Sequence, residues 1–247
     1  MNEIITGDLG VDRIDYLIRD SHHTGVMYGK FDYQRLLNTL TVIKDPVTSN
    51  PVLVIERGGL HAAEGLVLAR YFMFLQVYFH HVRRIYDIHL QDFLREILVD
   101  DTFPTELNDY LELNDFSILA GLKKANKDVS EKGHFPAELI LSRNHFRFVH
   151  EVTVSDRERD YGIFDKLKEE VKERFGEENC RFDEPGKATN QFSESEFLVV
   201  GSDKISNILE ESDLIKILKP IYRGRIYAKN DEKLKEDIKR FCKEFMG

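Results

Sequence analysis

The stretch GDLGVDRIDYLIRDSHHTGVMYGKFDYQRL, residues 7–36, decides how the first part of this chain folds. Successive residues of a helix turn by about 100°, so four polar side chains of this stretch share one face: Asp12, Arg13, Tyr16 and Asp20. The apolar side chains gather opposite them: Val11, Ile14, Leu17 and Ile18. The pattern predicts an amphipathic helix over residues 8–22. Its polar face is either a solvated surface crossed by ion pairs or the wall of a site.

The segments that follow predict further helices and a small hairpin. FDYQRLLNTL, residues 31–40, is typical of a short helix. Two β-rich runs flank a turn that contains proline and asparagine, so we expect a β-hairpin near residues 39–56. Residues 59–99 carry the strongest helical signal, as one long helix or two in series, and their middle is apolar on all sides. Two short helices and a polar connector over residues 126–136 complete this part.

After residue 142 the pattern changes to alternating strands and helices. The predicted order is β-α-β-β-α-β-α, with EFLVVG, residues 196–201, as one of the strands. This order is typical of a ferredoxin-like α+β unit. We therefore predict a mainly α-helical first part, residues 1–142, followed by an α+β ferredoxin-like domain, residues 143–247.

Composition restricts the class of protein. The chain has 247 residues, 42% of them hydrophobic and 32% charged, with a net charge of -9. That balance supports a folded core and disfavours binding to nucleic acid. Two distant cysteines, Cys180 and Cys242, favour a reducing cytoplasm over a disulfide framework. The most apolar run, YFMFLQVYF, is too short to cross a bilayer, so we expect a cytoplasmic protein with no membrane contact.

A motif in the first stretch resembles a known family. VDRIDYLIRDSHHTG followed by YGKFDYQRL is similar to the last metal-ligand motif of the HD-superfamily deoxynucleoside triphosphate triphosphohydrolases, which include bacterial dGTPases and the metazoan SAM-and-HD-domain dNTPase. ARYFMFLQVYFHHVRR resembles the next helix of that family. The resemblance implies the C-terminal portion of an HD-domain phosphohydrolase, which cleaves a dNTP into a deoxynucleoside and triphosphate.

The same resemblance implies roles for individual residues. Asp12 would be the fourth ligand of a divalent metal (Mn, Fe, Ni, Zn or Mg), whose other ligands in the family are H…HD. Arg13 would hold phosphate oxygens, Tyr16 would pack against the sugar, and Asp20 would accept a hydrogen bond from its 3′-hydroxyl. Asp32 and Arg35 match positions that bind a regulatory nucleotide in some members.

The chain departs from the family in its histidines. None of the nine is followed by aspartate, and all lie after Asp12, whereas the family's H…HD precedes this motif. We therefore expect a truncated or split HD phosphohydrolase that does not bind the metal stably or hydrolyse a dNTP such as dGTP alone. A separate HD-bearing polypeptide would complete the site, and exposed apolar surface would favour a homo-oligomer. The alternative is a non-catalytic module for nucleotide sensing or protein interaction.

Other candidate residues have competing interpretations. One histidine at the end of the apolar run, His81, and Arg83 could face the nucleotide, or they could be polar residues where a helix leaves the core. His22 and His23 point about 100° apart on a helix, so we favour a loop or interface role over chelation. YRGRIYAK, residues 222–229, mixes basic and aromatic residues, but one such strand in an acidic protein makes nucleic acid an improbable partner.

Overall fold

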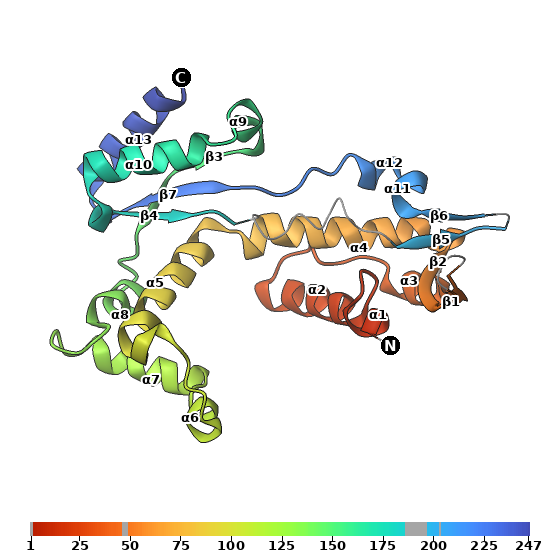
Figure 1. Ribbon diagram of the computed structural model, residues 1–247, viewed down its shortest axis with the longest axis horizontal. Coiled ribbons are helices and arrows are strands. Elements are labelled where there is room, and N and C mark those ends of the chain that lie inside the picture. Colours follow the sequence, from red (N-terminus) through yellow and green to blue (C-terminus); the bar gives the residue numbers. More distant parts are fainter. Residues whose placement is uncertain (1, 46–48, 186–196, 203) are drawn as a thin grey trace. The chain divides into compact units, whose positions relative to one another are not determined.

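The computed structural model describes residues 2–45, 49–185, 197–202 and 204–247 (Figure 1). The chain forms two compact units, and each unit is built from two separate segments. The first unit contains Met1–Phe79 and Pro185–Ile221, and the second contains His80–Glu184 and Tyr222–Gly247.

The first unit combines helices with a four-stranded sheet. Its helices are α1 (Asn2–Thr6), α2 (Val11–Thr24), α3 (Tyr33–Thr39), α4 (Leu60–Met73), α11 (Ile208–Glu211) and α12 (Asp213–Lys216). Its strands are β1 (Leu40–Lys44), β2 (Pro51–Glu56), β5 (Leu198–Val200) and β6 (Ile205–Asn207), in the order β1-β2-β5-β6. The β1–β2 pair is antiparallel, as expected of a hairpin near residues 39–56, and residues 46–48 of its turn lie outside the described residues.

Helix α2 is amphipathic as the sequence indicated. Ile14 and Leu17 are buried in one core with Leu36 and Leu66, and α4 runs beside α2 (Figure 1). Gly25 ends α2 in the left-handed conformation, with φ of 74°, and its N–H donates to carbonyls of the last turn. Glycine suits this position because a residue with a Cβ is sterically strained in this conformation. Because the apolar side of α2 is buried in this core, its polar face lies on the side of the helix that points away from the core.

The helical run of residues 59–99 is two helices in series. A short 3-10 turn (η1, Arg57–Gly59) leads into α4, which continues as a π-helical turn, η2 (Phe74–Tyr78). Helix α5 (His81–Ile97) then starts at a new N-cap, where Nδ1 of His80 accepts a hydrogen bond from the Val82 N–H at 3.4 Å. The break at Phe79 and His80 coincides with the junction between the two compact units.

The second unit holds a helical group and an α+β group. The helical group contains α5, α6 (Leu107–Glu112), α7 (Asp115–Ala125), α8 (His134–Leu141) and the 3-10 turn η3 (Val99–Asp101). The α+β group contains β3 (Arg147–Val152), α9 (Val154–Arg159), α10 (Ile163–Phe175), the 3-10 turn η4 (Glu177–Asn179), β4 (Cys180–Asp183), β7 (Gly224–Ala228) and α13 (Glu232–Met246). Strand β7 lies between β3 and β4 and is antiparallel to both. A mainly helical part and a sheet-containing α+β part are therefore both present, as predicted.

The membership of the α+β group differs from the expectation for residues 143–247. EFLVVG was expected as a strand of this group, but β5 within it pairs in parallel with β2 of the first unit. The second sheet therefore has three strands, β3, β7 and β4. Strand β7 follows the segment Pro185–Ile221, which belongs to the first unit. The expected boundary between residues 142 and 143 falls inside the second unit. The physical reason is that strand partners are chosen over long sequence separations, which local periodicity does not report.

None of the described helices has both the length and the apolar character that a membrane span needs.

Candidate functional site

Three of the four polar residues on α2 are engaged in a cluster within the first unit. Arg13 forms an ion pair with Asp8, which precedes the helix. Tyr16 meets Tyr78 of η2 edge to face, with ring centroids 6.3 Å apart. The Tyr78 hydroxyl donates a hydrogen bond to Oδ2 of Asp20 at 2.7 Å. The polar face of α2 is thus an organised surface rather than a set of separate solvated side chains.

An arginine from α4 completes this cluster. Arg70 is only 9% exposed, and its guanidinium lies 5.6 Å from the ring centroid of Phe74. Its guanidinium also interacts with the Tyr16 side chain. Burial, and then repulsion from Arg13, lowers the pKa of Arg70 below its usual value. A guanidinium keeps its charge even so, so Arg13 and Arg70 place two positive groups beside Tyr16.

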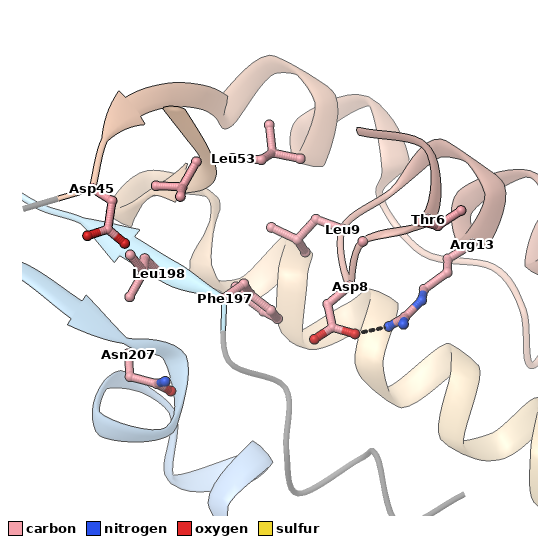
Figure 2. Close-up of a pocket in the computed structure, with 11 residues that line it drawn as sticks. Thr6, Asp8, Leu9, Arg13, Asp45, Leu53, Phe197, Leu198 and Asn207 are labelled. Carbon is pink, nitrogen blue, oxygen red and sulfur yellow. Dashed lines mark hydrogen bonds and ion pairs between the residues drawn. The ribbon is translucent and has the colours of Figure 1, made fainter. Parts of the chain in front are cut away.

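A pocket of about 570 Å³ opens beside Arg13 and Asp8 (Figure 2). Figure 2 shows the Arg13 guanidinium pointing at the Asp8 carboxylate, while Asp45 and Asn207 contribute polar groups elsewhere on the wall. The side chains of Arg13 and Asp8 are 17% and 26% exposed, so both remain accessible. An anionic ligand that takes Arg13 as its partner must replace Asp8 in that ion pair.

We call the group of Asp8, Arg13, Tyr16, Asp20, Arg70 and Tyr78 the α2–α4 cluster. The sequence assigned Arg13, Tyr16 and Asp20 to a site but did not assign Asp8, Arg70 or Tyr78. The available signal for Arg70 was a charged residue inside an apolar run. Tyr78 lies eight positions after Arg70, and no local pattern separates it from the other aromatic residues of that run.

Asp12 lies apart from these contacts. Its side chain is exposed on the first turn of α2. Across the described ranges, no group of three or more His, Cys, Asp or Glu side chains could hold a metal ion. Because a lone carboxylate does not make a site for a divalent ion of this kind, the described residues do not fit the implied metal by themselves.

Asp32 and Arg35 line a different groove of the first unit, with a volume of about 620 Å³. Asp32 caps α3 by accepting the Arg35 N–H at 2.9 Å. The Arg35 guanidinium donates to the Gly58 carbonyl from Nε at 3.2 Å and from Nη2 at 2.9 Å. Tyr28 and Phe72 also line the groove, with ring centroids 6.1 Å apart. The groove combines aromatic faces with a fixed guanidinium.

His81 and Arg83 belong to the second unit, whereas the α2–α4 cluster belongs to the first. The His81 ring stacks near His80 and Phe148, with centroids 4.4 and 5.2 Å away. Burial lowers the pKa of His81, which favours its neutral form. Arg83 pairs with Asp87 one turn later on α5, at 3.3 Å. These contacts give both residues local roles within α5 and its neighbours.

Comparison with known proteins defines the class of this chain. The family model of the HD-associated region matches residues 31–246, so the chain belongs to that family. This confirms the HD-superfamily part of the resemblance. The preference for dGTP stays a prediction.

Individual relatives extend this result. The chain is 40% identical over 91 residues to YwfO of Bacillus subtilis, covering 20% of that protein. It is 30% identical over 130 residues to MJ1154 of Methanocaldococcus jannaschii, covering 28% of it. The chain therefore spans less than a third of these curated relatives.

Solved structures share the fold. A hypothetical protein from Aquifex aeolicus matches with a TM-score of 0.75 and 36% identity, over 96% of this chain and 58% of that one. A phosphohydrolase from Bacteroides thetaiotaomicron matches with a TM-score of 0.67 and 21% identity, over 92% and 63%. The match extends along nearly all of this chain and leaves more than a third of each neighbour uncovered.

Proposed function

We propose that this chain is the C-terminal part of an HD phosphohydrolase and forms the phosphate- and sugar-binding wall of a dNTP site. In this proposal Arg13 and Arg70 bind phosphate oxygens and Tyr16 packs against the sugar. Asp20 accepts a hydrogen bond from the 3′-hydroxyl of that sugar. Asp12 is the carboxylate that this chain adds to a metal whose histidine ligands come from an HD-bearing polypeptide or from further sequence. The chain alone is then inactive.

The observation that supports this proposal most is the composition of the α2–α4 cluster. Two guanidinium groups, a phenol and a carboxylate belong to one cluster, and these are the groups that a phosphorylated sugar needs. Oδ2 of Asp20 already accepts a hydrogen bond from the Tyr78 hydroxyl, at 2.7 Å. A sugar hydroxyl can take the place of that donor without any change in the chemistry of the hydrogen bond. The pairing of Arg13 with Asp8 keeps the positive charge balanced until an anion arrives.

A calorimetric titration with dGTP tests the binding wall. We expect saturable binding that Arg13→Ala weakens about tenfold or more, because a charge-assisted contact to phosphate is lost. Arg19→Ala is the matched control, since Arg19 is on the same helix but pairs with Asp15 at its exposed edge. Equal affinities for the two variants would contradict the assignment of Arg13.

A triphosphate-release assay tests whether the site is incomplete. The pure 247-residue chain with Mn²⁺ or Mg²⁺ and dGTP is expected to release no triphosphate. Release that is robust and is lost in Asp12→Ala would contradict the need for histidines from elsewhere. Addition of a polypeptide that carries H…HD is expected to restore release that depends on Asp12.

The groove that contains Arg35 favours a second candidate function, a nucleotide-sensing module. Its fixed guanidinium and its aromatic walls suit a base and a phosphate together. Under this alternative, Arg35→Ala abolishes the dGTP titration and Arg13→Ala leaves it unchanged. The same pair of variants therefore separates the two candidates.

A further inference from the structure

A surface of the second unit combines exposed apolar side chains with uncompensated negative charge. Between residues 99 and 121 the sequence contains six acidic residues and no lysine, arginine or histidine. Large apolar side chains in the same segment are exposed: Val99, Phe103, Leu107, Tyr110, Leu111, Phe116 and Leu119. We call these apolar side chains, together with the acidic residues Asp100, Asp101, Glu106, Asp109, Glu112 and Asp115, the acidic apolar surface.

The apolar side chains are exposed to an unusual degree. Phe116 is 86% exposed, Leu107 68% and Leu111 63%. Helix α6 buries none of its residues, although it carries leucine and tyrosine at Leu107, Tyr110 and Leu111. That i, i+3, i+4 spacing forms a stripe on one side of a helix. An exposed group of large apolar residues of this kind marks an interaction surface.

A groove passes between the turn η3 and helices α6 and α7. It has a volume of about 490 Å³, and apolar residues such as Ile97, Leu98 and Leu113 line it. The charged side chains on its wall are all carboxylates: Asp100, Asp109 and Glu112. All six acidic residues of the surface are exposed, and no basic side chain of the described chain pairs with any of them. Figure 1 shows α6 at the free end of the helical group.

Charge selects among the possible occupants. A second copy placed by a two-fold axis would set the same carboxylates against one another, which like-charge repulsion disfavours. An anionic lipid surface and nucleic acid carry the same sign and are disfavoured for the same reason. A helix with leucine-like residues on one side and lysine or arginine beside them satisfies both features of the surface.

We propose that the acidic apolar surface is the docking site for a cationic amphipathic helix of a partner protein. The apolar stripe of the partner lies in the groove beside α6, and its basic side chains pair with Asp109, Glu112 and their neighbours. The proposal is independent of dNTP chemistry, because every residue that it uses lies in the second unit.

The test uses the whole chain and a labelled synthetic peptide of leucine and lysine, with leucine at helical i, i+3, i+4 spacing. Fluorescence anisotropy is expected to show saturable binding that weakens as salt rises. A peptide with the same leucines and glutamate in place of lysine is expected not to bind. A peptide of the same composition in a strand-like alternating order is expected to bind at least about tenfold more weakly.

Two double variants separate the apolar and the charged contributions. Leu111→Ser with Phe116→Ser and Asp109→Asn with Glu112→Gln are each expected to weaken peptide binding about tenfold or more, and the second is expected to flatten its salt dependence. Because all four side chains are exposed, both variants should fold normally. The matched controls are Val129→Ser, on an exposed loop residue, and Glu170→Gln with Glu173→Gln, on α10.

Loss of binding in both double variants, with both controls unchanged, supports the docking site. An equal loss of peptide binding in the α10 control would show that the peptide is attracted by net charge alone, and would overturn the proposed docking site. Sedimentation that reveals self-association through Leu111 and Phe116, with no peptide binding, would assign the surface to a second copy and would also overturn it.

Discussion

Asp20 and Arg13 both have internal partners that a ligand of the proposed site would replace. Tyr78 donates to Asp20 at 2.7 Å, and Asp8 pairs with Arg13. These contacts hold both side chains in place, so less conformational entropy is lost when a ligand binds. The same contacts compete with the ligand. In the proposed nucleotide site, Asp8 and Tyr78 therefore affect the affinity together with Arg13 and Asp20.

His89 carries a prediction about pH at the scale of one residue. It is fully buried on α5, and its Nε2 accepts the Phe146 N–H at 3.3 Å, so the ring is neutral. Burial, with help from Arg181 and His145, lowers the pKa of His89 to about 4. An unfolded histidine takes up its proton near pH 6.5, so between about pH 6.5 and 4 the unfolded state binds more protons than the folded state.

The free energy of unfolding of the second unit is therefore expected to fall as pH drops from about 6.5 to 4, by up to about 3 kcal/mol from His89. Burial lowers the pKa of His145 and His150 as well, so they act in the same direction. Denaturant titrations at several pH values measure this slope. His89→Gln keeps an acceptor and removes the titration, so its curve should be flatter. An identical slope in His89→Gln would contradict the role given to His89.

At the scale of single elements, replacement by alanine is expected to change stability in opposite directions at two glycines. Gly25 ends α2 at φ of 74°, and an added Cβ would have open space around it, so only the backbone penalty remains. Gly25→Ala should lower stability by about 1 kcal/mol. Gly121 lies inside α7, where an added Cβ would meet Phe93 at an ordinary 3.5 Å. Gly121→Ala should raise stability by about 0.5–1 kcal/mol. Urea titrations of both variants measure the two signs, and a shared sign would contradict this account.

At the scale of the whole molecule, the two units have separate cores, and each core should respond to its own mutations. Leu17 is fully buried in the first unit and Leu167 in the second. Replacement of either by alanine leaves a cavity and should cost about 2–5 kcal/mol. Hydrogen exchange should rise mainly in α2 and α4 for Leu17→Ala, and mainly in α10 and β7 for Leu167→Ala. An equal rise across both units for either variant would show one cooperative core instead.

The chain passes between the two units three times, at Phe79–His80, after Glu184 and after Ile221. This arrangement places the α2–α4 cluster in one unit and the acidic apolar surface in the other. The proposed nucleotide wall and the proposed docking site can therefore be tested by separate variants in the same chain.

The sequence by itself determined the elements whose period is local. The alternation of polar and apolar residues in α2 placed Asp12, Arg13, Tyr16 and Asp20 on one face. The family match over residues 31–246 confirms the resemblance to the HD superfamily. Helix–turn signals also located α6 and α7 and the β1–β2 hairpin. These features depend on side chains within a few residues of each other, so a short window of sequence contains the necessary information.

Only the tertiary structure decided which distant residues meet. Tyr78 reaches Asp20 across 58 positions, and β5 leaves the α+β group to pair with β2. Arg70 of α4 joined the candidate site, while His81 and Arg83 lie in the second unit. The physical reason is that such contacts depend on how whole elements pack, and that choice is made by burial and shape across the chain rather than by any local pattern.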